Sequence, residues 1–171
     1  SGQTKVYGSA DPILVGTLSG FLNADGVTAT YTRAAGETVL GGPYTISATL
    51  SPSDVLSNYD ISYNTASFVI TAKSASVTPA SGQTKVYGAA DPILVGSLSG
   101  FLNDDGVTAT YNRAAGETVL GGPYSISATL SPSDVLSNYD ITYNTASFAI
   151  TTKSASVTPA SGQTKVYGSA D

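Results

Sequence analysis

Cysteine, methionine, tryptophan and histidine are all absent from the 171 residues of this sequence. Without cysteine the fold contains no disulfide, and without cysteine or methionine it lacks the side chains that oxidise most readily. Nucleophilic triads, zinc sites and general bases that act near neutral pH usually depend on histidine or cysteine. We therefore expect the protein not to be an enzyme and to need no cofactor.

Charged residues are also scarce, at 11% of the chain, and the formal net charge is −5. Nucleic acids and anionic membrane surfaces are bound by clusters of lysine and arginine, and such clusters do not occur here. The sequence also has no apolar run of about 20 residues, the length needed to cross a bilayer. We expect no nucleic-acid partner and no membrane insertion by this segment.

What the sequence does contain is a repeat of 80 residues. Residues 1–80 align without gaps on residues 81–160, and residues 161–171 open a third copy. Because the chain starts and stops within the pattern, we expect it to be part of a longer tandem array. The two copies differ at only eight pairs of positions: Ser9/Ala89, Thr17/Ser97, Ala24/Asp104, Thr32/Asn112, Thr45/Ser125, Ser62/Thr142, Val69/Ala149 and Ala72/Thr152.

Apolar and polar residues alternate with a period of two in several segments of each repeat. This alternation predicts strands with one face in the core and the other in water. In the first copy, the predicted strands cover residues 27–32, 44–50, 59–63 and 67–71. Residues 12–22 are less regular and predict a strand followed by a turn, and Pro52 to Asn58 can form at most one helical turn.

The boundary between modules depends on the segment that follows the last of these strands. It is either the first strand of the next module or a linker. We favour the strand, because Val77 continues the alternation and a linker of small polar residues would couple neighbouring modules loosely. The chain then divides into residues 1–73, which lack their first strand, a complete module over 74–153, and a first strand with its loop over 154–171. The expected inter-module strands are Ser74, Ala75, Ser76, Val77, Thr78 and Pro79, and Ser154, Ala155, Ser156, Val157, Thr158 and Pro159.

The strand that residues 1–73 lack has the same sequence as the one that residues 154–159 offer. An identical chain placed end to end could supply it, as in the addition of a strand to an exposed sheet edge. A boundary placed within one continuous array explains the same observation.

Carboxylates are the remaining candidates for chemistry, since paired carboxylates can hydrolyse glycosides. Most of them fall in predicted turns, where aspartate is favoured for its turn geometry, so a structural role is the preferred interpretation. In the first copy these residues are Asp11, Asp25, Glu37, Asp54 and Asp60.

A weak calcium candidate is the group Asn103, Asp104 and Asp105, which places three oxygen donors before Gly106. The first copy has Ala24 in place of Asp104, and no twelve-residue loop with a closing glutamate follows. We therefore favour a tight turn over a metal site.

The alternation assigns most of the 11 tyrosines to the core and leaves threonine and serine on the outer strand faces. Such hydroxyl-rich faces could bind glycans, a flat surface or like fibres. Threonine is also simply a favourable residue for an exposed strand.

Six motifs occur in the same order in both copies. In the first copy they are KVYGSADP at residues 5–12, LSGF at 18–21, RAAGE at 33–37, GPYTI at 42–46, NYDI at 58–61 and FVIT at 68–71. Through these motifs each repeat resembles the bacterial MBG domain of YGX type. The resemblance implies large, secreted, often adhesin-like bacterial surface proteins in which such domains serve as spacers, with no catalytic residues and no required cofactor. It also implies a small β-rich fold that is β-grasp-like. Because the sequence predicts strands but only one helical turn, an immunoglobulin-like β-sandwich stays open.

We expect, in sum, a mainly β chain of small modules joined end to end as an extracellular stalk, spacer or filament of a bacterial surface adhesin. The alternative is that the repeats themselves bind a surface or glycan, or associate with one another, through their Thr/Ser faces. The expected partners are neighbouring modules of the same chain or identical chains placed end to end.

Overall fold

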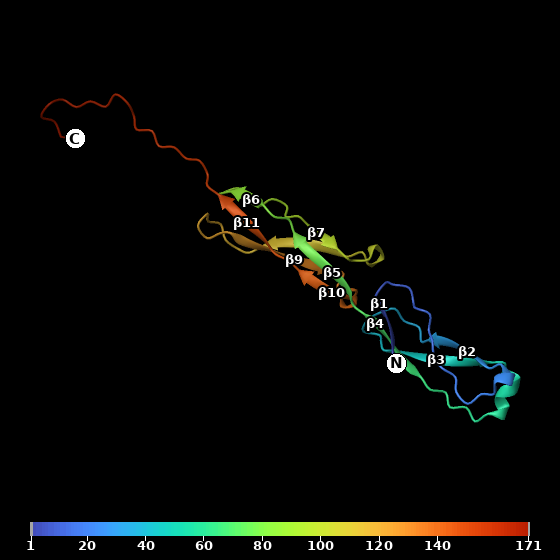
Figure 1. Ribbon diagram of the computed structural model, residues 1–171. Helices are drawn as coiled ribbons and strands as arrows, with labels where there is room; N and C mark the ends of the chain where they lie inside the picture. Colours follow the sequence, from blue (N-terminus) through green and yellow to red (C-terminus); the bar gives the residue numbers. More distant parts are fainter. Residues whose placement is uncertain (1, 171) are drawn as a thin grey trace.

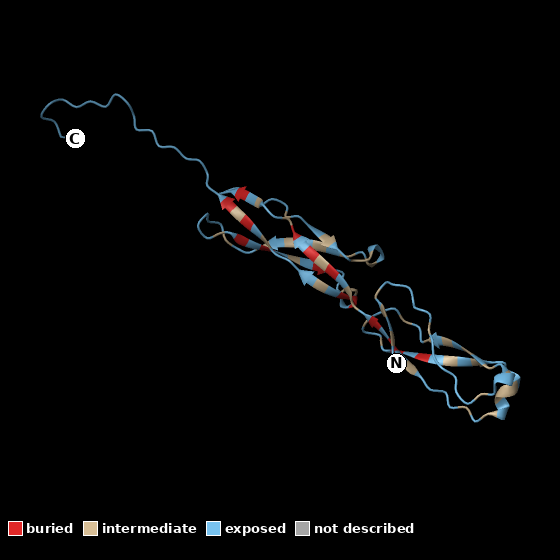
Figure 2. Ribbon diagram, viewed as in Figure 1, coloured by how far each residue is buried: buried red, intermediate tan, exposed pale blue. Residues whose placement is uncertain are grey.

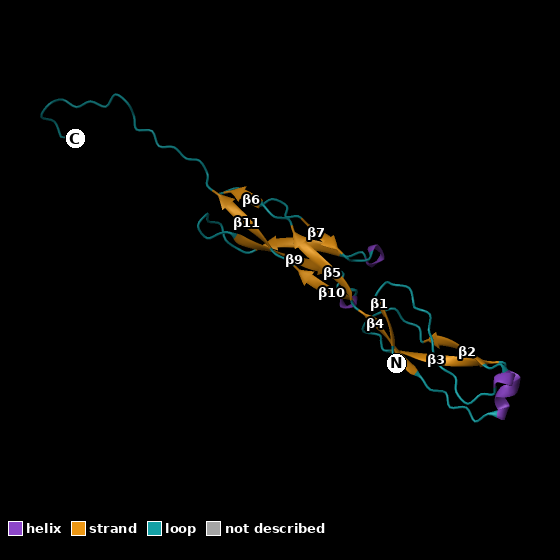
Figure 3. Cartoon of the chain, viewed as in Figure 1, coloured by secondary structure: helices purple, strands orange, loops and turns teal. Residues whose placement is uncertain are grey.

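The computed structural model describes residues 2–170 and has the shape of a rod (Figure 1). Two β-rich units follow one another along its length, and residues 154–170 extend beyond them without forming a strand. We call residues 2–72 the N-terminal module and residues 73–153 the C-terminal module. The prediction of a mainly β chain built from tandem modules is confirmed (Figure 3).

The N-terminal module contains one sheet of four strands in the order β1-β4-β3-β2. β1 runs parallel to β4, whereas β4 pairs antiparallel with β3 and β3 with β2. Two short 3-10 helices, η1 and η2, occupy its loops. The bounds are β1 Gln3–Val6, η1 Asn23–Asp25, β2 Thr28–Arg33, β3 Tyr44–Ser51, η2 Ser53–Asn58 and β4 Ala66–Thr71.

The C-terminal module repeats this sheet as β6-β11-β9-β8 and adds a second sheet of three strands, β10-β5-β7. β5 is the central strand of the second sheet, parallel to β10 and antiparallel to β7. The bounds are β5 Lys73–Pro79, β6 Gln83–Val86, β7 Gly96–Ser99, η3 Asn103–Asp105, β8 Thr108–Arg113, β9 Tyr124–Ser131, η4 Leu136–Asn138, β10 Tyr139–Tyr143 and β11 Ala146–Thr151.

The two sheets of the C-terminal module lie against each other, with β5 next to β9 and β7 next to β8. Residues 2–170 contain only 3-10 helices and no α-helix. This two-sheet arrangement is closer to the sandwich alternative than to a β-grasp, in which a helix covers the sheet. No helix within residues 2–170 has the length and apolar character needed to cross a membrane.

The core of each module comes from the alternating strands that the sequence predicts. Tyr44 and Ile46 of β3 pack against Phe68 and Ile70 of β4, and all four are buried. The equivalent residues of β9 and β11 form the same cluster in the C-terminal module. Because side chains on a strand alternate between its two faces, the threonines and serines between these residues point to water (Figure 2).

One predicted strand forms in only one of the two copies. Residues 139–143 form β10, but the equivalent residues 59–63 form no strand, although they differ from β10 only at Ser62. Residues 96–99 form β7, and the equivalent residues 16–19 again form none. The prediction of a strand over residues 59–63 is therefore wrong for the N-terminal module. The physical reason is that β10 and β7 both pair with β5, which has no counterpart in the N-terminal module.

Replacing Val77 tests how much the central strand contributes, because this side chain is 0% exposed between the two sheets. We expect Val77→Ala to lower the free energy of unfolding of the C-terminal module by about 2 kcal/mol, from lost burial and the cavity left behind. Val157→Ala is the matched control, since Val157 has the same neighbours in sequence but is exposed, and it should change stability by less than about 0.5 kcal/mol. Denaturant unfolding of the dilute protein measures the free energy of unfolding of both variants. Equal losses of stability would contradict the assignment of Val77 to a central, stabilising strand.

Candidate functional site

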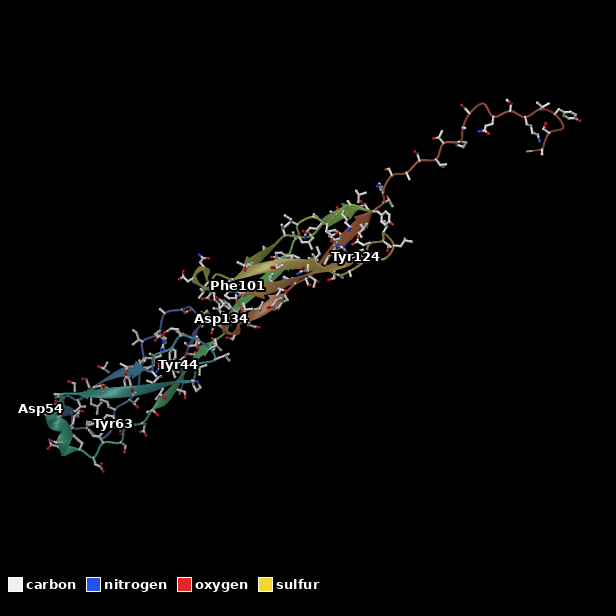
Figure 4. All side chains as sticks on the ribbon, turned by 180° about the vertical axis from the view of Figure 1, so that it is seen from behind. Tyr44, Asp54, Tyr63, Phe101, Tyr124 and Asp134 are labelled. Atoms are coloured by element: carbon white, nitrogen blue, oxygen red, sulfur yellow. The ribbon has the colours of Figure 1, made fainter. Side chains whose placement is uncertain are left out.

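The two modules meet where the end of β1 approaches the turns of the C-terminal module. Both modules point the same way along the rod: in Figure 4, Asp54 lies at the far end of the N-terminal module, and its counterpart Asp134 lies at the corresponding end of the C-terminal module. The tail of one module, near Tyr7, therefore faces the head of the next. We call the contacting residues Tyr7, Val39, Asp105, Asn138 and Tyr139 the junction cluster.

Asp105 is the centre of this cluster, because its carboxylate accepts hydrogen bonds from tyrosines of both modules. The Tyr7 hydroxyl lies 3.1 Å from each of its oxygens, and the Tyr139 hydroxyl donates to Oδ2. The Tyr7 and Tyr139 rings also meet edge to face, with centroids 5.4 Å apart. Hydrogen bonds to a charged group are stronger than those between neutral groups, so this contact favours one relative orientation of the modules.

Local sequence places each of these groups. Asp105 closes the short helix η3, which ends at Gly106 in the left-handed conformation with φ of 59°. The Tyr139 hydroxyl accepts a hydrogen bond from the Leu102 backbone N–H at 3.0 Å, and its ring packs on Phe101. Across the junction, Gly8 has φ of 77°, a conformation that favours glycine, and a Cβ there would lie 2.5 Å from Leu102 Cδ1, so the Leu102 side chain would have to move.

Asn138 supplies a second point of attachment. Its side chain is only 3% exposed, and its Oδ1 accepts a hydrogen bond from the Val39 backbone N–H of the other module at 2.9 Å. Asn138 is not among the residues that the sequence predicts to be functional. The only signal was the NYDI motif at residues 58–61 and again at 138–141, which gave no indication that the asparagine reaches a neighbouring module.

Both tyrosines of the junction stay protonated well above neutral pH. Burial and the hydrogen bond to Asp105 raise the pKa of Tyr139 to about 12, and the same two causes raise the pKa of Tyr7. Their hydroxyls therefore remain hydrogen-bond donors to Asp105 at physiological pH.

The two free ends of the pair carry the same groups without their partners from a neighbouring module. At the head of the N-terminal module, Tyr59 donates to Asp25 just as Tyr139 donates to Asp105, but Asn58 is exposed. At the tail of the C-terminal module, Tyr87, the counterpart of Tyr7, is 50% exposed. Each module thus carries one half of a junction at each end.

An ionic cluster holds the loops of each module against its sheet. In the N-terminal module, Asp11 lies 2.7 Å from Lys5 Nζ and 2.5 Å from Arg33 Nε, and Glu37 pairs with both cations. The Arg33 guanidinium also stacks over the Phe68 ring at 4.9 Å. The C-terminal module repeats the cluster with Lys85, Asp91, Arg113 and Glu117.

These ion pairs keep the carboxylates of the cluster ionised. Hydrogen bonds from Arg33 and then Lys5 hold the pKa of Asp11 at about 2, and those from Lys5 and then Arg33 lower the pKa of Glu37. Among the candidate carboxylates, the structure brings together only these two. Asp25 is bound by Tyr59, whereas Asp54 and Asp60 are exposed.

The three residues of the calcium candidate do not converge on one point. Asp105 is occupied by the two tyrosine hydroxyls, while the side chains of Asn103 and Asp104 are exposed. The Gly106 N–H donates to the Asn103 carbonyl at 3.1 Å, which closes the turn. Residues 2–170 contain no group of three or more Asp and Glu side chains arranged to hold a metal ion.

The two expected inter-module strands have different environments. Residues 74–79 lie in β5, where Ala75, Val77 and Pro79 are buried. Residues 154–159 form no strand, and all of them are exposed.

Two segments of the chain, residues 1–69 and 75–149, match the family model described as MBG domain (YGX type). No curated protein and no solved structure is significantly similar to the chain.

The ionic clusters predict how stability depends on pH. Asp11 and Asp91 have pKa values of about 2 in the folded protein, compared with about 3.9 for an aspartate in an unfolded chain. Folding is therefore favoured by their ionised forms above pH 4, and this contribution is lost as the pH falls towards 2. We expect the free energy of unfolding to fall across this window, and the double variant Asp11→Asn, Asp91→Asn to be less stable at pH 7 and less sensitive to acid. If the free energy of unfolding of the double variant falls with decreasing pH as steeply as that of the unchanged chain, the assignment of this effect to Asp11 and Asp91 is wrong.

Proposed function

The chain belongs to the MBG domain family, YGX type, and on this premise we propose that it is a structural repeat region of a bacterial surface adhesin or fibre. In this role the modules act as a spacer or stalk outside the cell, holding other parts of the protein away from the surface. The ionic clusters then serve stability and not catalysis.

The observation that carries the proposal is the junction cluster. A flexible string of modules needs no specific contact between neighbours, whereas a stalk that keeps its length does. Here Tyr7 and Val39, from different loops of one module, bind Asp105 and Asn138 of the next. Two separate points of attachment oppose bending and rotation about the single connecting strand.

The junction also supports an array of many modules. Because the tail of each module is complementary to the head of an identical one, each added copy presents a new head or tail. The presence of both unmatched halves at the ends of this pair, at Tyr87 and at Asn58, fits such a repeated contact.

A rigid junction predicts a narrow distribution of distances between the two modules. Spin labels attached at Thr30→Cys and Thr110→Cys can measure it, since both positions are exposed and the natural chain has no cysteine. We expect the double variant Tyr7→Phe, Asn138→Ala to broaden the distribution roughly twofold or more. Tyr7→Phe removes the hydrogen bond to Asp105, which is worth about 1.5–3 kcal/mol, and Asn138→Ala removes the acceptor of the Val39 N–H.

The matched control is Tyr87→Phe, Asn58→Ala, which makes the same changes at the free ends and should leave the distribution narrow. A distribution that is already broad in the unchanged chain would rule out the rigid spacer.

A second candidate function rests on the outer face of the β2–β3 hairpin. Thr30 lies opposite Thr49 and Thr32 opposite Ser47, and all four side chains are exposed. This hydroxyl ladder recurs on β8 and β9 as Thr110 opposite Thr129 and Asn112 opposite Ser127, so that an amide replaces one of the four hydroxyls. We propose, as the alternative role, that these ladders bind glycans or neighbouring fibres.

A glycan array tests this alternative. If the ladder is a binding face, the unchanged chain should bind a defined set of glycans, and Thr30→Lys, Thr110→Lys should abolish binding by covering both ladders with long charged side chains. The control variant Ser67→Lys, Ser147→Lys changes residues that are exposed on β4 and β11 outside these ladders, and it should still bind the glycans. The absence of binding by the unchanged chain would remove glycans as the ligand.

A further inference from the structure

The first and last strands of the C-terminal module run side by side in the same direction. β5 pairs in parallel with β10, and β6 pairs in parallel with β11. β5 and β6 follow one another at the start of the module, and β10 and β11 follow one another at its end. The module therefore begins and ends with two lengths of chain, residues 73–86 and residues 139–151, that lie next to each other through both sheets (Figure 1).

Hydrogen bonds connect these two lengths also where they pass from one sheet to the other. The Asn144 backbone N–H donates to the Val77 carbonyl at 3.0 Å, and the Asn144 side-chain amide donates to the Thr78 hydroxyl at 2.9 Å. Beyond the second ladder, the Tyr87 N–H donates to the Thr151 carbonyl at 2.8 Å. The contact thus extends from the start of β5 to just past the end of β6.

The direction of these strands determines what happens when the two ends of the module are pulled apart. In Figure 1, β5, β6, β10 and β11 all point along the rod towards its C-terminal end. The chain enters the module at Lys73 and leaves it after Thr151, so tension along the rod pulls residues 73–86 backwards and residues 139–151 forwards. The two lengths must then slide past each other, which loads all the hydrogen bonds between them at once.

A pull that separates two strands sideways acts differently. It breaks their hydrogen bonds one after another, and each bond contributes a net free energy of only about 0.5–1.5 kcal/mol. Sliding has to overcome many such bonds in one step, so the module resists tension along the rod more than tension across it.

We propose that residues 73–86 and 139–151 form a clamp that allows the module to bear tension, so that the array acts as a tether and not only as a spacer. We call these two lengths the terminal clamp. This inference deepens the proposed function and rests on it, since a stalk that joins a cell to another surface carries the pull between them.

Side chains hold the outer strand of the clamp in place. β6 lies at the edge of its sheet and has a backbone partner on one side only. Its Lys85 side chain is only 5% exposed, lies 2.6 Å from Asp91 and also pairs with Glu117. Glu117 in turn binds Arg113 of β8, the strand at the opposite edge of the sheet. Because Lys85 is shielded from water, breaking these ion pairs is unfavourable, and they oppose the sliding of β6.

Tension passes from one module to the next without a slack linker. β4 ends at Thr71 and β5 begins at Lys73, so a single residue, Ala72, separates them. In the N-terminal module, β1 and β4 form the same parallel pair as β6 and β11. A pull therefore goes from the parallel pair of one module directly into the terminal clamp of the next.

Force spectroscopy on the 171-residue chain tests the clamp by comparing two directions of pull. Handles attached at Ser74→Cys and Ser154→Cys load the C-terminal module from end to end. Handles at Thr108→Cys and Ser131→Cys instead open the β8–β9 hairpin from the end opposite its loop. All four positions are exposed, and the natural chain has no cysteine.

We expect the end-to-end unfolding force to be at least about threefold higher than the hairpin force at the same loading rate, because forced unfolding reports the barrier to unfolding. An end-to-end force equal to or below the hairpin force would overturn the proposal.

Lys85→Met tests the contribution of the ion pairs, because it keeps the length of the side chain and removes its charge. It should lower the end-to-end force by about a third or more and leave the hairpin force unchanged. The matched control, Lys5→Met, makes the same change in the N-terminal module, outside the loaded segment, and should leave both forces unchanged. An equal loss of force in both directions would show that Lys85 stabilises the module in general, and would overturn its role in the clamp.

These outcomes are distinct from those of the spin-label experiment, which reports the junction in the absence of tension. A low end-to-end force together with a narrow distance distribution would remove the tether and leave the spacer intact. A high end-to-end force together with a broad distribution would remove the rigid spacer and leave the clamp.

Discussion

The insertion of β5 between β10 and β7 is the constraint on which the second sheet of the C-terminal module depends. Val77 is fully buried there, and the backbone of β5 bonds to a strand on either side. Where this strand is missing, in the N-terminal module, the flanking residues keep almost the same sequence but form no second sheet. Because β5 directly follows β4, the strand that completes one module is covalently joined to the end of the previous one.

This covalent link becomes a defined joint through a few polar contacts. The Asp105 carboxylate accepts hydrogen bonds from two tyrosines, one from each module, and Asn138 accepts a hydrogen bond from a backbone N–H across the boundary. Buried polar groups of this kind specify orientation, because any other arrangement would leave them without partners. One strand completes the next module, and a polar cluster fixes the direction of that module. This combination suits a chain whose proposed role is to act as a spacer of constant length.

Much of the fold could be predicted from the sequence, because the alternation of Tyr44, Ile46, Phe68 and Ile70 with polar residues already assigns the core face of β3 and β4. The strand over residues 59–63 was predicted from equally good alternation and does not form in the N-terminal module. Alternation reports which face a strand would bury, but it carries no information on whether the partner strand is present. The contacts of Tyr7 and Asn138 could not be predicted either, since they join residues about 100 positions apart.

The sequence by itself determined the repeat, the mainly β character and the family of this chain, because these depend on patterns that are local or that recur at a fixed spacing. Only the tertiary structure decided that residues 139–143 form a strand and residues 59–63 do not, that Asp105 binds two tyrosines and not a ring of metal ligands, and which face of each module meets its neighbour. Those features depend on distances between residues far apart in the sequence, and nearly identical repeats acquire different environments according to what lies beside them.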